Sequence, residues 1–206
     1  LYEALQRCAQ VHCVFVMDRT ILDTLPRADR RVEFIRDSLV ELDAGLRALA
    51  GKPGAGLMVV HGIAIDALPA LAVSLGANVV FTAHDYEPYA IARDHAVEAA
   101  LRAQHIALQT IKDHVIFERR EVLTQSGTPY GVFTPYKRAW LARLGDAPPA
   151  QYSCGPIAQA LAERPDAYTR DVPSLEFFGF QTTNLKALGI TPGAGAAAKL
   201  VADFLE

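Results

Sequence analysis

Short apolar runs and amphipathic stretches alternate along the first 111 residues. Four of these runs lack polar alternation, which is typical of strands buried on both faces; they lie at 11–17, 57–60, 79–81 and 106–111. The segments between them have apolar residues every three or four positions, which indicates helices packed on a sheet. Such an order implies right-handed crossovers between parallel strands. We therefore predict an α/β fold, a doubly wound (Rossmann-like) parallel sheet with helices on both faces.

The first long helix is expected to begin after Asp29, a candidate N-cap. Its apolar positions recur in steps of three and four: Val32, Ile35, Leu39, Leu42, Leu46 and Leu49. Arg31 precedes Ile35 by four residues and is therefore expected on the same inward stripe. An arginine there either extends outward to water or meets an acid or a ligand.

Two shorter helices follow in the same pattern. The first is expected to be capped by Asp66 and to end at Gly76, and the second is expected from about Tyr89 to Arg102. The glycines and lysine at 51–56 have the wrong order and spacing for a phosphate loop, so they predict only a turn.

After residue 117 the regular periodicity ends. A helix is expected through 133–144, and the stretch from Asp146 to Thr191 is rich in Pro and Gly, which predicts an irregular connector. The start of a last helix is expected at 193–206. We therefore predict an α/β domain at 1–144 and a connector region at 145–206.

Polar residues gather where the predicted strands end. Asp18 follows the first strand, Asp85 and Glu87 follow the third, and Arg31 opens the first long helix. Ligands bind at the carboxyl ends of parallel strands, so these four residues favour a ligand pocket. The two acids at 85 and 87 are also compatible with a general acid–base pair, or with simple capping of the next helix. No nucleophile or orienting base accompanies them, and no catalytic residue is assigned.

Composition narrows the class of protein. The chain has 206 residues, is 51% apolar and carries a net charge of −3, which argues against a generally basic, DNA-coating surface. No apolar run approaches the ~20 residues of a membrane span. Three cysteines without a CxxC pair favour a reducing, cytoplasmic compartment of bacterial type. Six scattered histidines predict no metal site. The chain opens with Leu1, already in helical spacing, so we expect it to be trimmed at its start.

Several motifs together resemble one known family. They are Phe15-Val16-Met17-Asp18, Arg31-Val32, Asp85-Tyr86-Glu87-Pro88-Tyr89-Ala90, Arg93-Asp94, Lys112-Asp113, Pro129-Tyr130 and Val132-Phe133-Thr134-Pro135-Tyr136 with Ala139-Trp140. In this order they resemble the amino-terminal domain of DNA photolyases, over about 11–144. The tail resembles the connector that leads into the family's helical domain.

The resemblance implies a deoxyribodipyrimidine photolyase, a DNA repair lyase that splits cyclobutane pyrimidine dimers with light and FAD. In that family FAD and the DNA groove belong to a carboxyl-terminal helical domain, which we expect to lie outside these residues. The implied partners are this chain's own FAD domain and, only through the parent enzyme, damaged DNA. The fragment itself is expected to be an antenna domain without catalytic activity. The family's opening strand, a central one, is also expected to be missing.

The resemblance also implies an antenna chromophore. Folate-binding relatives carry Asn-Glu where this chain has Tyr89-Ala90, so a deazaflavin or flavin is favoured over methenyltetrahydrofolate. By the motif match, a chromophore ring would be lined by Phe15, Met17 and Asp18. Its polar edge or side chain would bond Arg31, Asp85 and Glu87. A pocket without a chromophore is equally compatible with the sequence.

Two other classes stay open. The first is a cryptochrome, the light-sensing branch of the same family, which differs in residues of the absent domain. The second is an unrelated nucleotide-binding α/β module, which would need a glycine-rich phosphate loop after a strand, and none is found.

Overall fold

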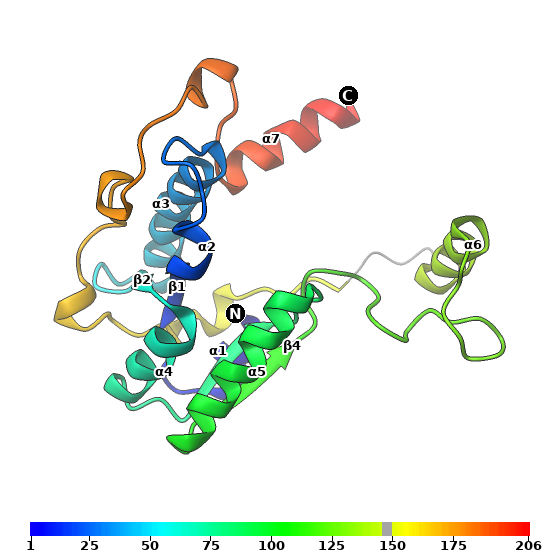
Figure 1. Ribbon diagram of the computed structural model, residues 1–206, viewed down its shortest axis with the longest axis horizontal. Helices are drawn as coiled ribbons and strands as arrows, with labels where there is room; N and C mark the ends of the chain where they lie inside the picture. Colours follow the sequence, from blue (N-terminus) through cyan, green and yellow to red (C-terminus); the bar gives the residue numbers. More distant parts are fainter. Residues whose placement is uncertain (146–149) are drawn as a thin grey trace.

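The computed structural model of this protein describes residues 1–145 and 150–206, and it contains the predicted alternation of strands and helices (Figure 1). The strands are β1 (Cys13–Asp18), β2 (Leu57–Gly62), β3 (Val79–Ala83) and β4 (Ala107–Ile111). The parallel α/β class predicted from the sequence is confirmed, because β1 pairs with β2 and β3 pairs with β4, both in parallel.

The sheet is divided into two halves. The β1–β2 ladder runs from Cys13 opposite Leu57 to Asp18 opposite Gly62, and the β3–β4 ladder from Val79 opposite Ala107 to Ala83 opposite Ile111. Within the described residues no ladder joins β1 to β3. That a central strand of the family precedes these residues stays a prediction.

The helices lie near the predicted positions, except for the four-residue α2, which was not predicted. They are α1 (Tyr2–Arg7), α2 (Arg19–Leu22), α3 (Arg30–Ala50), α4 (Ala64–Ser74), α5 (Pro88–Ala103), α6 (Phe133–Leu144) and α7 (Ala194–Leu205). Short 3₁₀ turns follow α6: η1 (Gly155–Ala160), η2 (Asp166–Tyr168), η3 (Glu176–Phe178) and η4 (Lys186–Leu188). None of the described helices is long and apolar enough to cross a membrane.

Helices cover both faces of the β1–β2 pair. Its larger hydrophobic cluster joins the strands to α3 and to residues far along the chain: Met17, Leu22, Val32, Leu39, Leu46, Leu57, Val172, Leu175, Phe178 and Phe180. On the other face, α4 contacts both strands and packs along α5. A second cluster, at Ala72, Val97, Leu101 and Ile106, joins α4 and α5 to the start of β4. The doubly wound arrangement thus follows from helices that bury one stripe each.

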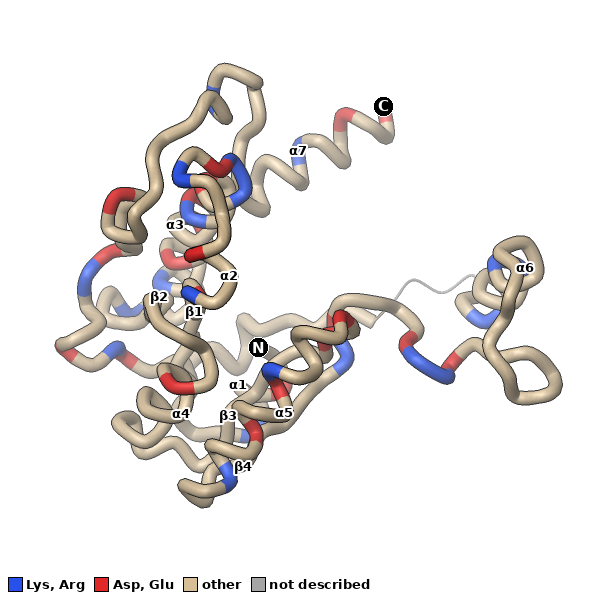
Figure 2. Tube along the Cα trace, in the orientation of Figure 1, with Lys and Arg blue, Asp and Glu red and all other residues tan. Residues whose placement is uncertain are grey.

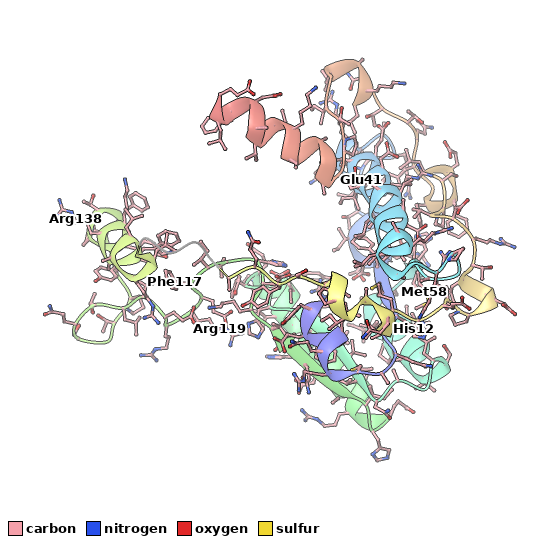
Figure 3. The ribbon with its side chains drawn as sticks, turned by 180° about the vertical axis from the view of Figure 1, so that it is seen from behind. His12, Glu41, Met58, Phe117, Arg119 and Arg138 are labelled. Carbon is pink, nitrogen blue, oxygen red and sulfur yellow. The ribbon has the colours of Figure 1, made fainter. Side chains whose placement is uncertain are left out.

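The irregular region at 150–192 packs on the α/β core. Phe178 and Phe180 are buried in the cluster under α3, and Lys52 donates hydrogen bonds to the carbonyls of Gln159 and Leu161. The predicted boundary between 144 and 145 stays a prediction, since residues 146–149, where the connector was expected to begin, lie outside the described residues. By contrast, α6 stands away from the strands at the end of an extended stretch (Figures 1 and 3).

The start of α4 differs from the prediction. Asp66 was expected as the N-cap, but the helix begins at Ala64, with Ile63 at the cap position and no side-chain cap from it. The Ala64 N–H instead donates to Oδ1 of Asp18 at 3.4 Å, from the end of β1. The prediction was wrong because the cap comes from a neighbouring strand, which local sequence cannot indicate. Asp66 lies in the first turn, where the helix dipole favours an acid.

The inward stripe of α3 is also rotated from the predicted one. Val32, Leu39 and Leu46 are buried, whereas the side chain of Arg31 is 71% exposed, so its predicted inward position is wrong. The buried face extends instead towards Glu33 and Asp43. The physical reason is the 150–192 region, which covers that side of the helix: Thr183 donates its N–H to Glu33 at 2.7 Å.

Candidate functional site

Asp18 lies at the carboxyl end of β1, where the sequence placed it. Its Oδ1 accepts the N–H of Thr20 at 3.0 Å and that of Ala64 at 3.4 Å, and the residue is buried. The carboxylate therefore caps α2 and joins β1 to the start of α4. A structural role for Asp18 is thus present in the fold, and its contact with a chromophore stays a prediction.

Phe15 and Met17 point to one face of β1, since they are two residues apart in a strand. Met17 is 3% exposed and belongs to the cluster under α3, and the half-buried Phe15 packs against the same cluster. The structure therefore gives both side chains a place in the hydrophobic core. Their predicted part in lining a ring stays a prediction.

Arg31 is paired with its own N-cap. Asp29 accepts the Arg31 backbone N–H at 2.8 Å and two guanidinium N–H groups, at 3.0 Å from Nε and 2.5 Å from Nη2. The Arg31 guanidinium lowers the pKa of Asp29 to about 2. This pair holds the first turn of α3 and leaves much of the Arg31 side chain in solvent.

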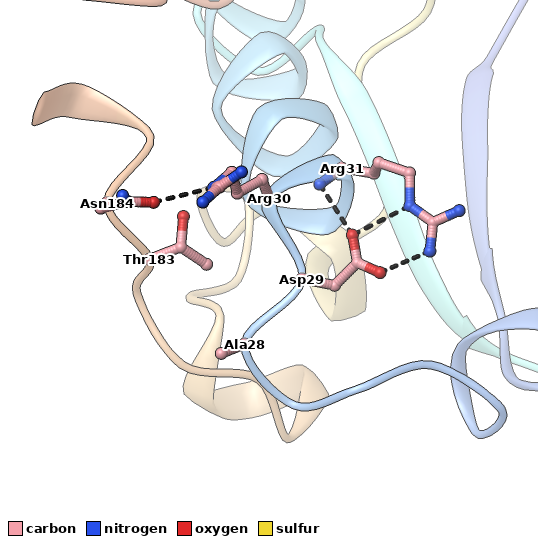
Figure 4. Close-up of a pocket in the computed structure, with 6 residues that line it drawn as sticks. All are labelled: Ala28, Asp29, Arg30, Arg31, Thr183 and Asn184. Atoms are coloured by element: carbon pink, nitrogen blue, oxygen red, sulfur yellow. Dashed lines mark hydrogen bonds and ion pairs between the residues drawn. The ribbon is translucent and has the colours of Figure 1, made fainter. Parts of the chain in front are cut away.

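A shallow hollow of about 520 Å³ lies at the start of α3, lined by Ala28, Asp29, Arg30, Arg31, Thr183 and Asn184. Figure 4 shows Arg30 and Arg31 extending to opposite sides of the helix start. Arg30 donates from Nε to Oδ1 of Asn184 at 2.8 Å, while Arg31 reaches only Asp29 among the residues drawn. Arg31 is therefore held by a carboxylate, whereas Arg30 is held by a single bond to a neutral amide.

The turn after β3 carries the two predicted acids. Oδ1 of Asp85 accepts the N–H of Tyr86 at 2.7 Å and that of Glu87 at 3.2 Å. These two bonds, that from Glu87 foremost, lower the pKa of Asp85 and keep its carboxylate ionised. Glu87 occupies the N-cap position of α5 without a side-chain cap bond. Within the described residues, no hydrogen bond or ion pair involves the Glu87 carboxylate, so it is available to a ligand.

Sequence reasoning missed a cluster beside these acids. His84 Nδ1 lies 2.8 Å from Oε2 of Glu118, and the Tyr86 hydroxyl donates to the same oxygen at 2.6 Å. The bond to Glu118 raises the pKa of Tyr86 to about 12, and the bonds from Tyr86 and His84 lower the pKa of Glu118. The sequence could have indicated His84 and Tyr86 as site residues, because both lie in the strand-end turn. Glu118 comes from a non-periodic stretch and had no signal of its own.

A second residue missed from the sequence is His61, opposite Met17 in the β1–β2 register. Its ring packs edge-on against Phe178 at 5.2 Å, and burial lowers its pKa. Among the described residues its buried Nε2 has no hydrogen-bond partner. A buried polar atom without a partner lowers the stability of the folded state, so this nitrogen could bond a group from outside the described residues.

The described part of the chain holds no group of three metal-ligating side chains, and both signs of charge are interspersed along α3 and its neighbouring loops (Figure 2). Within the described residues, no hydrogen bond or ion pair joins Arg31 to Asp85 or Glu87, and the hollow that Arg31 lines includes none of Asp18, Asp85 and Glu87. That these residues share one ligand site stays a prediction.

The fold is a parallel α/β domain in which Asp18 ends β1 and Asp85 lies in the turn after β3. The sequence model of the DNA photolyase family matches residues 1–153. The chain therefore belongs to the DNA photolyase family.

Relatives agree with this membership. The chain is 34% identical to the deoxyribodipyrimidine photo-lyase of Halobacterium salinarum, over 91% of this chain and 36% of the relative. It is 27% identical to cryptochrome-1 of Arabidopsis thaliana, over 63% of this chain and 19% of the relative. The chain thus spans well under half the length of these two curated relatives.

A solved structure supports the fold. A class III photolyase from Agrobacterium tumefaciens superposes with a TM-score of 0.72 at 23% identity, covering 98% of this chain and 40% of that one. This match extends across the 150–192 region as well as the strands. It corresponds to the amino-terminal α/β domain that the sequence motifs indicated.

Proposed function

We propose that this chain is the antenna domain of a deoxyribodipyrimidine photolyase and holds a light-absorbing chromophore at the carboxyl ends of β1 and β3. One observation carries the proposal: in a chain of this family, the turn after β3 presents Asp85 and an unpaired Glu87. When bound, the chromophore would absorb light and pass the excitation to FAD in a following domain. The fragment itself contributes binding and no bond-breaking step.

The chemistry of these side chains supports a flavin-like group. Such a ring has a polar edge that an exposed guanidinium satisfies, which is the part proposed for Arg31. Its ring nitrogens or side-chain hydroxyls would donate to the carboxylates of Asp85 and Glu87. The unpaired Nε2 of His61 adds polar capacity near the end of β2. Phe15, Met17 and Asp18 would border the ring from β1, which requires part of their present packing to open.

A deazaflavin or flavin is proposed over methenyltetrahydrofolate. Tyr89 and Ala90 stand where folate-binding relatives carry Asn-Glu, and Ala90 is buried in the first turn of α5, where it offers no polar group. A bound folate would therefore find no side-chain carboxylate of the protein at this position. A site that carries no chromophore is the alternative.

The test is a visible absorption spectrum. The chain is incubated in turn with a deazaflavin, FMN and methenyltetrahydrofolate, desalted, and scanned. A retained deazaflavin or flavin band supports the proposal, and a retained folate band overturns the choice of chromophore. Retention of none by the chain, with retention by the full-length parent, would assign the site to the complete protein rather than to this fragment.

The parent enzyme is proposed to be a DNA lyase, with its own FAD domain and damaged DNA as partners. Light-dependent repair of dimer-containing DNA is expected from the full-length parent and not from this chain. A full-length protein that binds FAD but repairs no dimers would favour the second candidate, a cryptochrome, which the similarity to cryptochrome-1 of Arabidopsis thaliana supports.

A cytoplasmic location is proposed as well. Cys8, Cys13 and Cys154 are all free thiols, which suits a reducing compartment. Cell fractionation tests this, and recovery with periplasmic proteins would contradict it.

A further inference from the structure

The turn that carries Asp85 and Glu87 is held by a carboxylate from elsewhere in the chain. One oxygen of Glu118 lies 2.8 Å from His84 Nδ1 and accepts the Tyr86 hydroxyl at 2.6 Å. The side chains of His84 and Glu118 are only 16% and 15% exposed, so water competes weakly for these bonds. His84 and Tyr86, the residues on either side of Asp85, are thus both bonded to Oε2 of Glu118.

Glu118 is itself held in place. Its backbone N–H donates to Glu121 at 2.7 Å, and Glu121 pairs with Lys112 at 2.9 Å. Lys112 also donates to the carbonyl of Ile116 at 3.1 Å. The loop from 112 to 121 is therefore closed on itself, directly after β4. Because β4 is paired with β3, the loop has a fixed position relative to the turn.

His84 anchors the other side of the turn. Its backbone N–H donates to the carbonyl of Ile111 at 2.8 Å, which extends the β3–β4 ladder by one residue. Its Nε2 lies 2.9 Å from Oγ1 of Thr110. Asp85 thus follows a residue held by its backbone and both ring nitrogens, and precedes a tyrosine held by its hydroxyl. The conformation of Asp85 is therefore set by these two anchored neighbours as well as by its own bonds to backbone N–H groups.

We propose that Glu118 is a positioning residue for the chromophore site: by holding His84 and Tyr86 it fixes the turn that presents Asp85 and Glu87. It acts through these neighbours and needs no contact with the chromophore. The inference rests on the proposed function, because the acids at 85 and 87 are the proposed ligand contacts. Preorganised contacts bind more tightly, since the cost of ordering the turn is met during folding.

The experiment compares Glu118→Ala and Glu118→Gln with the unchanged chain. Glu98→Ala is the matched control, because it removes an exposed carboxylate paired with Arg102 and does not touch the turn. Amide hydrogen exchange of Tyr86 and Glu87 reports on the turn, with the amides of α3 as the measure of global stability. Fluorescence titration with FMN and with a deazaflavin reports on the site.

In Glu118→Ala the amides of Tyr86 and Glu87 are expected to exchange about tenfold faster, while exchange of the α3 amides is unchanged. The affinity for whichever probe the unchanged chain binds, FMN or a deazaflavin, is expected to fall about tenfold. Glu118→Gln keeps an oxygen that accepts from both donors, so it should restore most of the affinity. Glu98→Ala should match the unchanged chain in both measurements.

Two results would overturn the inference. Unchanged exchange at Tyr86 and Glu87 in Glu118→Ala would mean that Glu118 does not hold the turn. Faster exchange with unchanged affinity would mean that the site does not depend on that hold. If the unchanged chain binds none of the probes, the proposed function fails instead, and exchange alone then decides whether Glu118 fixes the turn.

Discussion

The guanidinium of Arg164 lies 3.6 Å from the carboxylate of Asp43, from Nη1 to Oδ1, with both side chains buried. Arg164 also donates to the carbonyls of Leu57 and Arg170, at 3.3 and 3.2 Å. One side chain from the irregular 150–192 region thus ties together α3, the start of β2 and its own loop. Through this contact the 150–192 region stabilises the α/β unit.

Arg164→Ala is expected to destabilise the protein by about 3 kcal/mol, because it leaves a buried carboxylate and two carbonyls with fewer partners. Asp43 keeps its bond to Arg47, which limits the loss. Urea unfolding measures the change. Arg102→Ala, which removes an exposed ion pair with Glu98, is the control and should cost less than about 1 kcal/mol. Equal costs in the two variants would contradict the structural role of Arg164.

Phe178→Ala is expected to cost about 3–4 kcal/mol, since Phe178 is 3% exposed in the main cluster and its loss opens a cavity. Phe177→Ala is the matched control from the neighbouring position, where the side chain is 64% exposed. It should cost about 1 kcal/mol or less, the value of its ring contacts. Thermal or urea unfolding distinguishes the two. Similar small losses would mean that the 150–192 region is not packed on the core.

Gly56→Ala is expected to cost about 1–3 kcal/mol from backbone strain and crowding. The φ angle of Gly56 is +135°, and a Cβ there would clash with Oδ1 of the buried Asp43. Gly45→Ala, inside α3 with open space around it, should instead stabilise by about 0.5–1 kcal/mol, the helix propensity difference. Opposite signs in urea unfolding are the predicted result, and a neutral Gly56→Ala would contradict it.

The Asp29–Arg31 pair predicts an acid-sensitive contribution to stability. The pKa of Asp29 is lowered to about 2 in the folded chain, below its ordinary value of about 3.9. A depressed carboxyl pKa adds stability above the unfolded value, so this contribution is complete above about pH 4 and is lost as the pH falls towards 2. Carboxyl ¹³C titration by NMR should show the Asp29 pKa rising in Arg31→Ala. An unchanged pKa would mean that the pair does not form in solution.

Arg31→Ala is also expected to weaken binding of the retained chromophore about tenfold or more, because a charged hydrogen bond to the ring edge is lost. Arg30→Ala is its control, since Arg30 extends to the other side of the helix start and bonds Asn184. Fluorescence titration compares the two. A loss of affinity in Arg30→Ala alone would move the site into the hollow beside Asn184.

Much of the fold was predictable because its signals are local. The apolar run at 79–81 lies in β3, Asp29 caps α3 as its position predicted, and Gly76 follows α4 in the left-handed conformation. The site was predictable only in outline. Asp85 could be placed at a strand end from the sequence, but the residue that holds its turn, Glu118, lies in a stretch with no periodic pattern.

By itself the sequence determined the α/β class, the order of strands and helices, and family membership, because hydrophobic period and short motifs are encoded within a few adjacent residues. Tertiary structure alone decided which groups share a contact. It supplied the cap of α4 from Asp18 and bonded the buried Glu33 to Thr183. Each of these contacts depends on segments far apart in the chain meeting in space, and the free energy of such contacts leaves no trace in local sequence spacing.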